Sequence, residues 1–480
     1  MNLKHKAISG VIWNISGNIA NHIITFIVGI VLARLLTPKD YGLIGMTTML
    51  IVISQTFIES GFRQALIRKQ NCTNEDYSTI FLFNLFIAVI IYVILFFLSN
   101  YIALFFNEPE LKNIIRVISF SLIISSLGII QYTIFSKNIN FKLLSWISLI
   151  SSLVSGLVGI ILAYKNFGVW SLVIKTLCGD FINIFLWWSF SKWKPMFIFS
   201  RKSFKELFNF GSKLLITNLI DQFFWTIYYS TIGKFFSIQT LGYYTRAEMF
   251  KNLPSQNLTF VINAVAFPTL SALQKDSEAL KNSFKKFFLG TMLISTILIL
   301  GMAATAKALV LVLIGEKWIT TANYLQFLCI AALLFPASVL NSTILKVYNR
   351  SDLILKIEII RKLITIPSIF IGILFGIKIM LGFFIINSII DYFLYSYWSG
   401  KIINYSWKSQ VWDLIPTLLV GFVFATAVFL FGLPLSDNQF STLIIQMIIG
   451  IILLFFLFEI FKINSYVILK KTLFEYLIKK

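Results

Sequence analysis

The chain has 480 residues, of which 58% are apolar and only 13% are charged, and its mean hydropathy is +0.84. A soluble protein of this length needs far more polar surface, whereas lipid covers the outside of a membrane protein. The composition therefore excludes a soluble domain and predicts an integral membrane protein. The net charge of +21 comes from 41 basic and 20 acidic side chains, and their distribution decides whether it indicates nucleic-acid binding.

Fourteen stretches of the chain are long and apolar enough to be membrane spans, since a helix needs about 20 mostly apolar residues to cross a hydrocarbon core of about 30 Å. In chain order they are 9–33, 41–60, 78–106, 114–135, 143–164, 167–190, 211–236, 241–266, 287–313, 320–345, 363–379, 380–400, 411–432 and 441–461. The loops between them are mostly short and leave no room for a soluble domain. We therefore expect an all-α integral membrane protein with about fourteen transmembrane helices.

The basic residues are distributed unevenly over the predicted loops. An even number of spans places both termini on one side of the membrane. If that side is the cytoplasm, 29 of the 41 basic residues lie in inside loops and tails, nine lie outside and three lie within helices. This bias follows the positive-inside rule, so the charge is topological and no nucleic acid is needed to explain it. We expect a multi-pass protein of the inner (cytoplasmic) membrane with both termini in the cytoplasm.

A weak internal repeat appears at a shift of 200 residues. RLLTPKDYG at 34–42 aligns with KFFSIQTLG at 234–242, and Asn18 and Asn21 align with Asn218 and Asp221. Two six-helix halves of like orientation imply a pseudo-two-fold axis along the membrane normal, which is one architecture of secondary transporters. The longest inside connection, about 191–210, separates these halves. The lobes expected are 1–206 and 207–408, followed by two additional C-terminal helices and a cytoplasmic tail over 409–480.

Polar residues recur on one face of the first predicted helix and again on the seventh. The first carries Asn14, Asn18, Asn21 and Thr25. The seventh carries Asn218, Asp221 (or Gln222), Trp225 and Tyr228. At about 100° per residue, steps of three and four keep such residues on one face. Polar groups facing lipid are costly, so the stripes predict a water-filled cavity. The alternative is that they only join helices by hydrogen bonds. The matching stripes favour the cavity.

Charged residues inside the predicted spans are the other candidates for function. Arg246, Glu248 and Lys251 precede Pro254 in the eighth predicted helix, where a hydrated cavity would accommodate them. Arg246 is the first candidate for an anion contact, because Arg246 and Lys251 diverge by about 140° on a straight helix. The alternative is a shallow segment whose charges are solvated.

The remaining intramembrane charges are Lys175, Asp180, Glu59 and Asp391. Glu59 and Arg63 are spaced i, i+4, as in a simple surface ion pair. Asp221 and Asp391 are the better candidates for binding a proton or a sodium ion, because a desolvated carboxylate can exchange protons near neutrality. The spans hold slightly more acidic than basic residues, so composition alone does not indicate a cationic cavity.

Nothing in the sequence predicts an enzyme, a metal site or a cofactor. Cys72, Cys178 and Cys329 are far apart and match no metal or redox spacing, and two histidines are too few for a histidine-based site. The chain has no phosphate-binding loop of the Walker type. A membrane polymerase or glycosyltransferase would need long outside loops with catalytic groups, and the longest here covers only about 98–113.

Six stretches carry a resemblance to a known family. They are ARLLTPKDYGLIGM (33–46), FFNEPELKNIIRVISFSLII (105–124), NFGVWSLV (166–173), SFKELFNFGSKLL (203–215), IGKFFSIQTLGYYTRAEMFKNLP (232–254) and FPTLSALQKD (267–276). In this order they resemble the polysaccharide transporter family, the Wzx-like flippases of the multidrug/oligosaccharidyl-lipid/polysaccharide exporter superfamily. The branch that exports colanic and teichuronic acid precursors is most similar.

The resemblance implies a MATE-like fold of two six-helix lobes around a central cavity, plus two C-terminal helices. It implies transport of an undecaprenyl-diphosphate-linked oligosaccharide (an O-antigen, capsule or exopolysaccharide repeat unit) from the cytoplasmic to the outer leaflet, with polysaccharide polymerases as candidate partners. It also implies a diphosphate contact by Arg246 and Lys251, with Lys175 and Arg34 at further matching positions. The alternative within the superfamily is an ion-coupled antiporter for drugs or organic cations.

Overall fold

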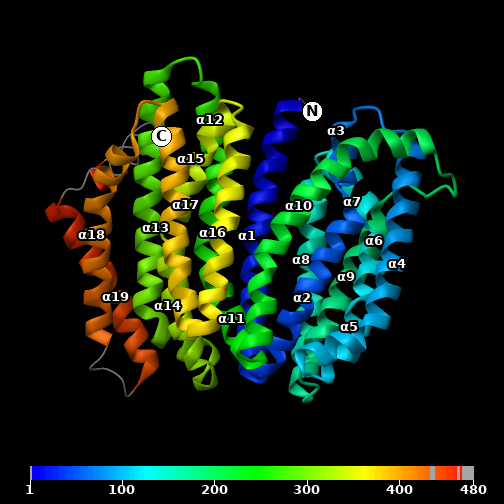
Figure 1. Ribbon diagram of the computed structural model, residues 1–480, viewed down its shortest axis with the longest axis horizontal. Coiled ribbons are helices and arrows are strands. Elements are labelled where there is room, and N and C mark those ends of the chain that lie inside the picture. The colour runs from blue at the N-terminus through cyan, green and yellow to red at the C-terminus, as the bar shows by residue number, and fades with distance from the viewer. Residues whose placement is uncertain (1–2, 433–437, 462–464, 468–480) are drawn as a thin grey trace. The chain divides into compact units, whose positions relative to one another are not determined.

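The computed structural model describes residues 3–432, 438–461 and 465–467, and every regular element in these ranges is a helix (Figure 1). The predicted all-α class is therefore confirmed. By its internal contacts the chain divides into two compact units, residues 1–242 and 243–480. The lobe boundaries predicted near residues 206 and 408 stay a prediction.

The first unit is a bundle built from ten helices and the start of an eleventh. These are α1 (Leu3–Leu35), α2 (Pro38–Glu59), α3 (Phe62–Arg68), α4 (Asn74–Phe106), α5 (Glu110–Ile118), α6 (Phe120–Ser126), α7 (Ile129–Lys137), α8 (Phe141–Tyr164), α9 (Trp170–Phe190), α10 (Arg201–Phe235) and the first turn of α11 (Ile238–Val261). Helix α8 packs between α1 and α9, and α10 packs along α2.

The second unit contains the remainder of α11 and the helices that follow. These are a π-helical turn (Ile262–Ala266), α12 (Phe267–Ala272), α13 (Ser277–Ile314), a 3-10 turn (Glu316–Trp318), α14 (Ile319–Ala332), α15 (Phe335–Val347), α16 (Ser351–Phe375), α17 (Ile377–Ile402), α18 (Trp407–Gly432) and α19 (Gln439–Phe461). Helix α13 packs against α14 and α18, and α16 packs against α17. The tail after residue 467 lies outside the described residues.

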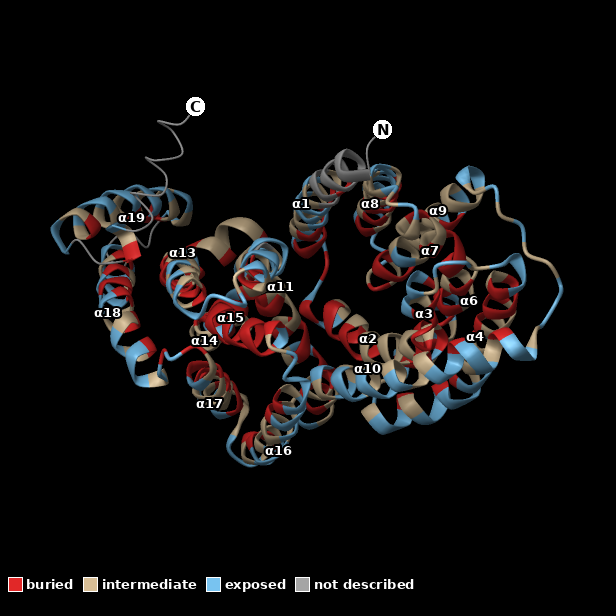
Figure 2. Cartoon of the chain, turned by 90° about the horizontal axis from the view of Figure 1, so that it is seen from above, coloured by how far each residue is buried: buried red, intermediate tan, exposed pale blue. Residues whose placement is uncertain are grey.

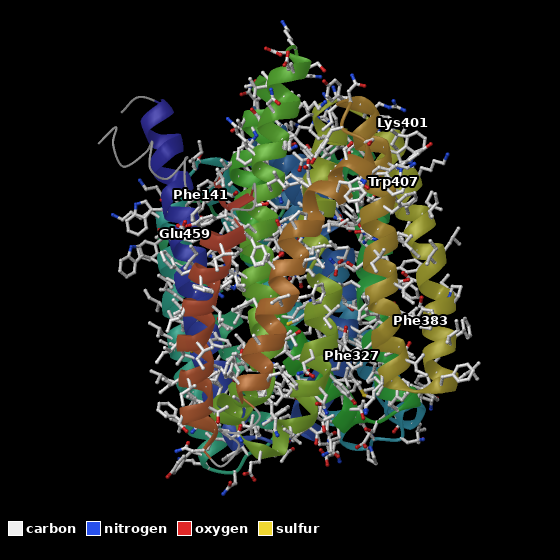
Figure 3. The ribbon with its side chains drawn as sticks, turned by 90° about the vertical axis from the view of Figure 1, so that its left-hand side faces the viewer. Phe141, Phe327, Phe383, Lys401, Trp407 and Glu459 are labelled. Atoms are coloured by element: carbon white, nitrogen blue, oxygen red, sulfur yellow. The ribbon has the colours of Figure 1, made fainter. Side chains whose placement is uncertain are left out.

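Within each unit, buried residues occupy the helix faces that turn toward neighbouring helices, and exposed residues occupy the outer faces (Figure 2). Many of the exposed side chains are large and apolar, for example Phe97 on α4 and Phe455 on α19. Such outward apolar faces are what lipid covers in a membrane protein. Lys401 and Trp407 lie toward the same end of the second unit (Figure 3), and basic and tryptophan side chains are typical of the membrane interface.

The number of spans differs from the sequence prediction. Among the described residues, ten helical segments are long and apolar enough to cross a membrane, or eleven if the bent pair Glu110–Ser126 and Ile129–Lys137 counts as one span. Helices α10, α11 and α16 overlap predicted spans but do not meet this test, because they hold too many polar or charged side chains. The predicted count of fourteen is therefore not confirmed.

Three helices begin ten or more residues earlier than the hydropathy pattern indicated. Helix α10 begins at Arg201 rather than near 211, α13 at Ser277 rather than near 287, and α16 at Ser351 rather than near 363. The added turns carry several charged residues. These residues lower the mean hydropathy, so a search for apolar stretches does not detect these turns as helix. The break after α16 lies at Gly376, whose φ of 104° is in the region that favours glycine, and not at 379.

The start of α10 is held to the first unit on two sides. The backbone N–H groups of Met196 and Ser200 donate to the hydroxyls of Ser78 and Thr79 on α4, each at 3.0 Å. Lys69 forms ion pairs with Asp76 at 3.0 Å and with Glu206, on α10, at 3.1 Å. Figure 1 accordingly shows the first turns of α10 lying across the end of this unit before the helix continues beside α2.

The Lys69 ammonium keeps its charge at this position. Burial lowers its pKa, but the hydrogen bonds to Asp76 and Glu206 outweigh burial, so the pKa of Lys69 lies above its ordinary value. Lys69 therefore holds the connection between α3 and α4 to α10 as an ammonium at any physiological pH.

The 200-residue repeat reappears in the helix ends. Helix α1 ends at Leu35 and α10 at Phe235, while α2 begins at Pro38 and α11 at Ile238. The turn before α2 is closed by a capping box, in which the Thr37 hydroxyl accepts from the backbone N–H of Asp40 and the Asp40 carboxylate accepts from the backbone N–H of Thr37. The loop between the first two predicted spans is therefore as short as the sequence indicated.

Two glycines of the repeat allow these helix starts to touch. A Cβ atom on Gly42 would lie 1.9 Å from the carbonyl oxygen of Ile238, and one on Gly242 would lie 1.8 Å from the carbonyl oxygen of Pro38. Any side chain at either position would overlap the opposite backbone. The contact is reciprocal, as expected for equivalent positions of a repeat.

Candidate functional site

The polar stripe on α1 is only partly available to a ligand. Asn18 is exposed, whereas Asn21 is half-buried and its side-chain carbonyl accepts a hydrogen bond from the Ser152 hydroxyl on α8. The side chain of Asn14 lies outside the described residues. Asn21 thus takes part in a helix–helix hydrogen bond, the alternative that the sequence left open.

The stripe on α10 and the basic residue at the end of α1 lie nearer the surface of the first unit. Asn218 is half-buried, and Asp221 and Arg34 are exposed. That Asn18, Asn218 and Asp221 line a common passage stays a prediction.

The charged segment of α11 lies in a continuous helix. The helix runs through Pro254 to Val261 and is followed by the π-helical turn. Arg246 is half-buried and its Nη1 donates to the Met249 sulfur at 3.0 Å, whereas Glu248 is buried and Lys251 is half-buried. Arg246 is therefore held along its own helix by the thioether, which is a weak acceptor that a stronger anion can replace.

Asp391 on α17 is part of a charged network with α16. It is 8% exposed, and its Oδ1 lies 3.3 Å from Nη1 of Arg361, which also lies 3.2 Å from the Glu358 carboxylate. The Tyr395 hydroxyl donates to Glu358 at 2.9 Å. Because Asp391 already has a cationic partner, binding of a sodium ion there would have to displace Arg361.

Helix α9 carries two of the predicted intramembrane charges. The stem of Lys175 packs on α8, since a Cβ atom on Gly159 would lie 3.0 Å from the Cβ of Lys175. Asp180 is half-buried, and within the described part of the chain it has no hydrogen bond or ion pair. The two charges therefore differ: one packs against a helix and the other is available.

Asp180 lines a cavity of about 290 Å³ inside the first unit. The cavity is lined by residues of α2, α3, α6, α7 and α9: Gln55, Glu59, Arg63, Ser125, Ile129, Tyr132, Asp180, Asn183, Ile184 and Trp187. We call it the α9 cavity.

The bend between α6 and α7 explains where the α9 cavity lies. The two helical segments meet at an angle of 42°, and Leu127 and Gly128 occupy the break. The indole N–H of Trp188 donates to the Leu127 carbonyl at 3.0 Å and so pairs a group that the break frees from the helix. A Cβ atom on Gly128 would lie 2.7 Å from the Trp187 ring, so glycine lets that ring approach the break and wall the cavity.

One side of the α9 cavity is a chain of charged and aromatic groups. Arg63 lies 3.7 Å from the Glu59 carboxylate and over the Tyr132 ring at 5.4 Å. The rings of Tyr132 and Trp187 meet edge to face at a centroid distance of 5.4 Å. The predicted Glu59–Arg63 ion pair is confirmed, but it lines a cavity and is not merely a surface pair.

The other polar groups of the α9 cavity have no protein partner in the described ranges. They are the side chains of Gln55, Ser125, Asp180 and Asn183. An unsatisfied polar group costs several kcal/mol in hydrocarbon. The arrangement therefore favours contact with water or with a polar ligand.

Sequence reasoning found the charged residues of the α9 cavity but missed the cavity. A usable signal was present on α9, because Asp180, Asn183 and Trp187 recur at steps of three and four and so share one face. In the sequence, Trp187 and Tyr132 do not indicate a site, because aromatic residues are common in membrane spans. Among the described residues, no group of His, Cys, Asp or Glu could hold a metal ion.

Comparison with known proteins places the chain in context. Residues 31–323 match a family model described as "polysaccharide biosynthesis protein". The teichuronic acid biosynthesis protein TuaB of Bacillus subtilis is 24% identical over 439 residues, which cover 91% of this chain and 90% of that protein. The lipopolysaccharide biosynthesis protein WzxC of Escherichia coli is 23% identical over 88% of each chain.

Among solved structures, the lipid II flippase MurJ in an inward closed conformation has a TM-score of 0.74 at 17% identity, covering 94% of this chain and 98% of that one. An inward-facing multidrug MATE transporter has a TM-score of 0.63 at 15% identity, covering 80% and 94%. At these identities the likeness shows the fold alone, and it confirms the expected MATE-like membrane fold.

Proposed function

This chain belongs to the polysaccharide biosynthesis protein family, and from that premise we propose that it flips a lipid-linked oligosaccharide across the inner membrane. The cargo is an undecaprenyl-diphosphate-linked repeat unit, moved from the cytoplasmic to the outer leaflet by alternating access. The family match is the observation that carries the proposal, and it confirms the resemblance inferred from the motifs.

The named relatives support a transporter over an enzyme. One relative is the succinoglycan biosynthesis transport protein ExoT of Rhizobium meliloti, 22% identical over 306 residues that cover 64% of this chain and 62% of that protein. TuaB and WzxC are likewise named for bacterial cell-surface polysaccharides. The flippase fold of MurJ fits the same assignment.

The physics of the cargo requires such a protein. A hydrated oligosaccharide and a diphosphate cannot cross hydrocarbon unaided, because each unsatisfied polar group costs several kcal/mol. The protein supplies a wet groove that opens alternately to each side of the membrane, while the polyprenyl tail stays in lipid. Asn18 and Asn218 supply polar groups to this groove, whereas Asn21 is hydrogen-bonded to Ser152 of α8.

The diphosphate is contacted by basic residues inside the membrane. Arg246 is the first of these, because it lies in a stretch that resembles the family motif and its guanidinium contacts the Met249 thioether, a weak acceptor. Lys251, Lys175 and Arg34 are the further contacts that the family resemblance implies. Both termini lie in the cytoplasm, and polysaccharide polymerases act on the product.

The membrane potential supplies the driving force. Moving about two negative charges outward is favoured by an inside-negative membrane potential, and at ~100 mV it releases roughly 4–5 kcal/mol. Coupling to a proton or sodium ion is optional, with Asp221 and Asp391 as the candidates, and a sodium ion at Asp391 would have to displace Arg361.

Deletion of the gene tests the proposed function. We expect the deletion strain to accumulate a lipid-linked oligosaccharide on the cytoplasmic leaflet and to lose the corresponding surface polysaccharide. Unchanged surface polysaccharide, together with increased sensitivity to cationic drugs, would instead support the antiporter.

The Arg246→Ala variant tests the proposed contact with the diphosphate. It should abolish complementation of the deletion while the folded protein remains at wild-type amounts in the membrane. Thr176→Ala on α9 is a matched control, because Thr176 is exposed and hydrogen-bonds only within its own helix. Normal flipping by Arg246→Ala would remove Arg246 from the site.

A further inference from the structure

We infer that the α9 cavity is a saccharide-binding subsite, which holds one neutral or amino sugar of the cargo while the diphosphate is bound elsewhere. The inference rests on the proposed function for the source of the sugar. It is carried by the size, the walls and the charge of the cavity.

The size of the cavity suits a sugar residue. Sites for small molecules usually measure roughly 300–1,000 Å³, so a cavity of about 290 Å³ holds a ligand of one or two rings. A whole repeat unit or a polyprenyl chain is too large for it. A bare metal ion or a proton needs no such space.

The aromatic wall matches the apolar face of a pyranose. Tyr132 and Trp187 meet edge to face and present ring surface to the cavity, and the C–H groups on one face of a sugar ring pack against such surfaces. The indole N–H of Trp187 is itself buried, so Trp187 would contact the sugar through its ring surface and not through a hydrogen bond.

The polar wall matches the hydroxyl groups of the sugar. Each hydroxyl both donates and accepts, so a sugar is recognised where donors and acceptors alternate. Gln55 and Asn183 offer both, Asp180 accepts, and none of the three has a protein partner in the described part of the chain. A bound sugar would satisfy these groups together.

The charge of the cavity excludes the anionic part of the cargo. Two carboxylates, Glu59 and Asp180, face a single basic residue, Arg63, which is already held between Glu59 and the Tyr132 ring. The cavity therefore disfavours a diphosphate or a sugar acid and favours a neutral or amino sugar.

The position of the cavity fits a loading step. Glu59 is the last residue of α2, and Trp187 lies one turn before the end of α9 at Phe190. In the proposed topology both of these helix ends face the cytoplasm, the side from which the cargo is taken up. The subsite would therefore select the sugar before translocation.

Ligand binding by the full-length protein in lipid nanodiscs tests the inference. The probes are the methyl glycosides of glucose, galactose and N-acetylglucosamine, inorganic diphosphate, and the oligosaccharide released by mild acid from the lipid fraction of the deletion strain. Saturation-transfer NMR should detect the released oligosaccharide and at least one glycoside. Inorganic diphosphate has no C–H protons to observe, so it is added as a competitor and should leave the sugar signals unchanged.

Substitutions then locate the binding. Trp187→Leu should weaken sugar binding by about tenfold or more, and Asn183→Leu or Asp180→Asn by about three- to tenfold through lost hydrogen bonds. Trp146→Leu, at an exposed tryptophan of α8 outside the cavity, and Thr176→Leu, on the exposed face of α9, are matched controls that should bind normally. Because Trp187 packs on Gly128, the Trp187→Leu variant must also show a normal melting temperature. If Trp187→Leu misfolds, the Asp180→Asn variant still tests the inference.

The outcomes separate the subsite from the proposed function. If the same nanodisc protein flips the lipid-linked oligosaccharide but binds none of the sugars, or if the cavity variants bind them normally, the subsite is wrong and the function stands. A different result would identify the cavity as a cation site. In that case no sugar binds, and sodium chloride changes the tryptophan fluorescence of the wild type whereas choline chloride does not. The Asp180→Asn variant shows no response to sodium chloride. If the protein binds sugar but does not flip the lipid-linked oligosaccharide, the proposed function is contradicted and the saccharide subsite is still supported.

Discussion

Asp180 and Asp391 are intramembrane aspartates on α9 and α17, the helices that end the predicted six-helix halves, yet their surroundings are opposite. Asp391 lies 3.3 Å from Arg361, with Glu358 on the far side of the same guanidinium. Asp180 faces a cavity of about 290 Å³ and has no partner in the described part of the chain. The Asp391 carboxylate holds α16 and α17 together, whereas the Asp180 carboxylate is available to a ligand that enters the α9 cavity.

The difference teaches how a polar residue inside a membrane protein should be judged. Both aspartates look alike in the sequence, although the sequence favours Asp391, together with Asp221, for ion coupling. Their partners distinguish them: a buried carboxylate with a cation serves packing between helices, whereas one without a cation in a walled cavity serves a ligand. Substitutions can break or sharpen this contrast.

The largest effect should follow removal of the cation from the α16–α17 network. Arg361→Met leaves Asp391 and Glu358 without their cation, which should cost about 2–4 kcal/mol, below the upper values for buried pairs because Arg361 is 40% exposed. We expect a clear fall in melting temperature in detergent. Arg361→Met with Asp391→Asn should recover much of it, and equal losses in the single and double variants would contradict the network.

A direct comparison of the two aspartates should give a smaller difference. Asp391→Asn weakens one charged hydrogen bond and should cost about 1–2 kcal/mol. Asp180→Asn removes a desolvated charge that has no partner, so stability should stay within about 0.5 kcal/mol of wild type or rise. The two melting temperatures measure this, and an equal fall for both would show that Asp180 has a stabilising partner after all.

The smallest effect should come from the ion pair in the α9 cavity. Arg63→Met removes a pair whose side chains are 36% and 25% exposed and whose atoms are 3.7 Å apart, so the cost should be about 0–1 kcal/mol. The same thermal measurement tests it, with Arg361→Met as the matched comparison. A fall in melting temperature as large as that of Arg361→Met would show that the Glu59–Arg63 ion pair stabilises the fold substantially.

Periodicity and repeats predicted the helical frame well. The turn at Thr37 and its equivalent at Ser237 follow from polar capping residues and a glycine at the same offset, and the helix ends agree with that offset. Local chemistry determines such turns, so they can be found without knowing the tertiary structure.

Hydropathy failed where helices carry charge. The first turns of α10 contain Arg201 and Lys205, and those of α16 contain Lys356, so an average over apolar residues placed both helix starts too late. These turns are helical because tertiary contacts and hydrogen bonds hold them, as Lys69 holds Glu206.

The α9 cavity could be predicted only in part. The shared face of Asp180, Asn183 and Trp187 is visible in the sequence. The wall opposite depends on the bend at Gly128 and on contacts between distant segments, such as Arg63 with Tyr132. One sequence does not reveal which distant segments meet, so the partner of each polar residue had to come from the structure.

The paired glycines at the starts of α2 and α11 behave thermodynamically as a single position. A methyl group on Gly42 and one on Gly242 would each collide with the opposite carbonyl, and either collision is relieved by the same separation of the two backbones. Once one alanine has forced that separation, the second alanine finds the space already open. The cost of the double substitution is therefore well below the sum of the single costs, and the coupling between these residues, 200 apart in sequence, reports how closely the two backbones touch.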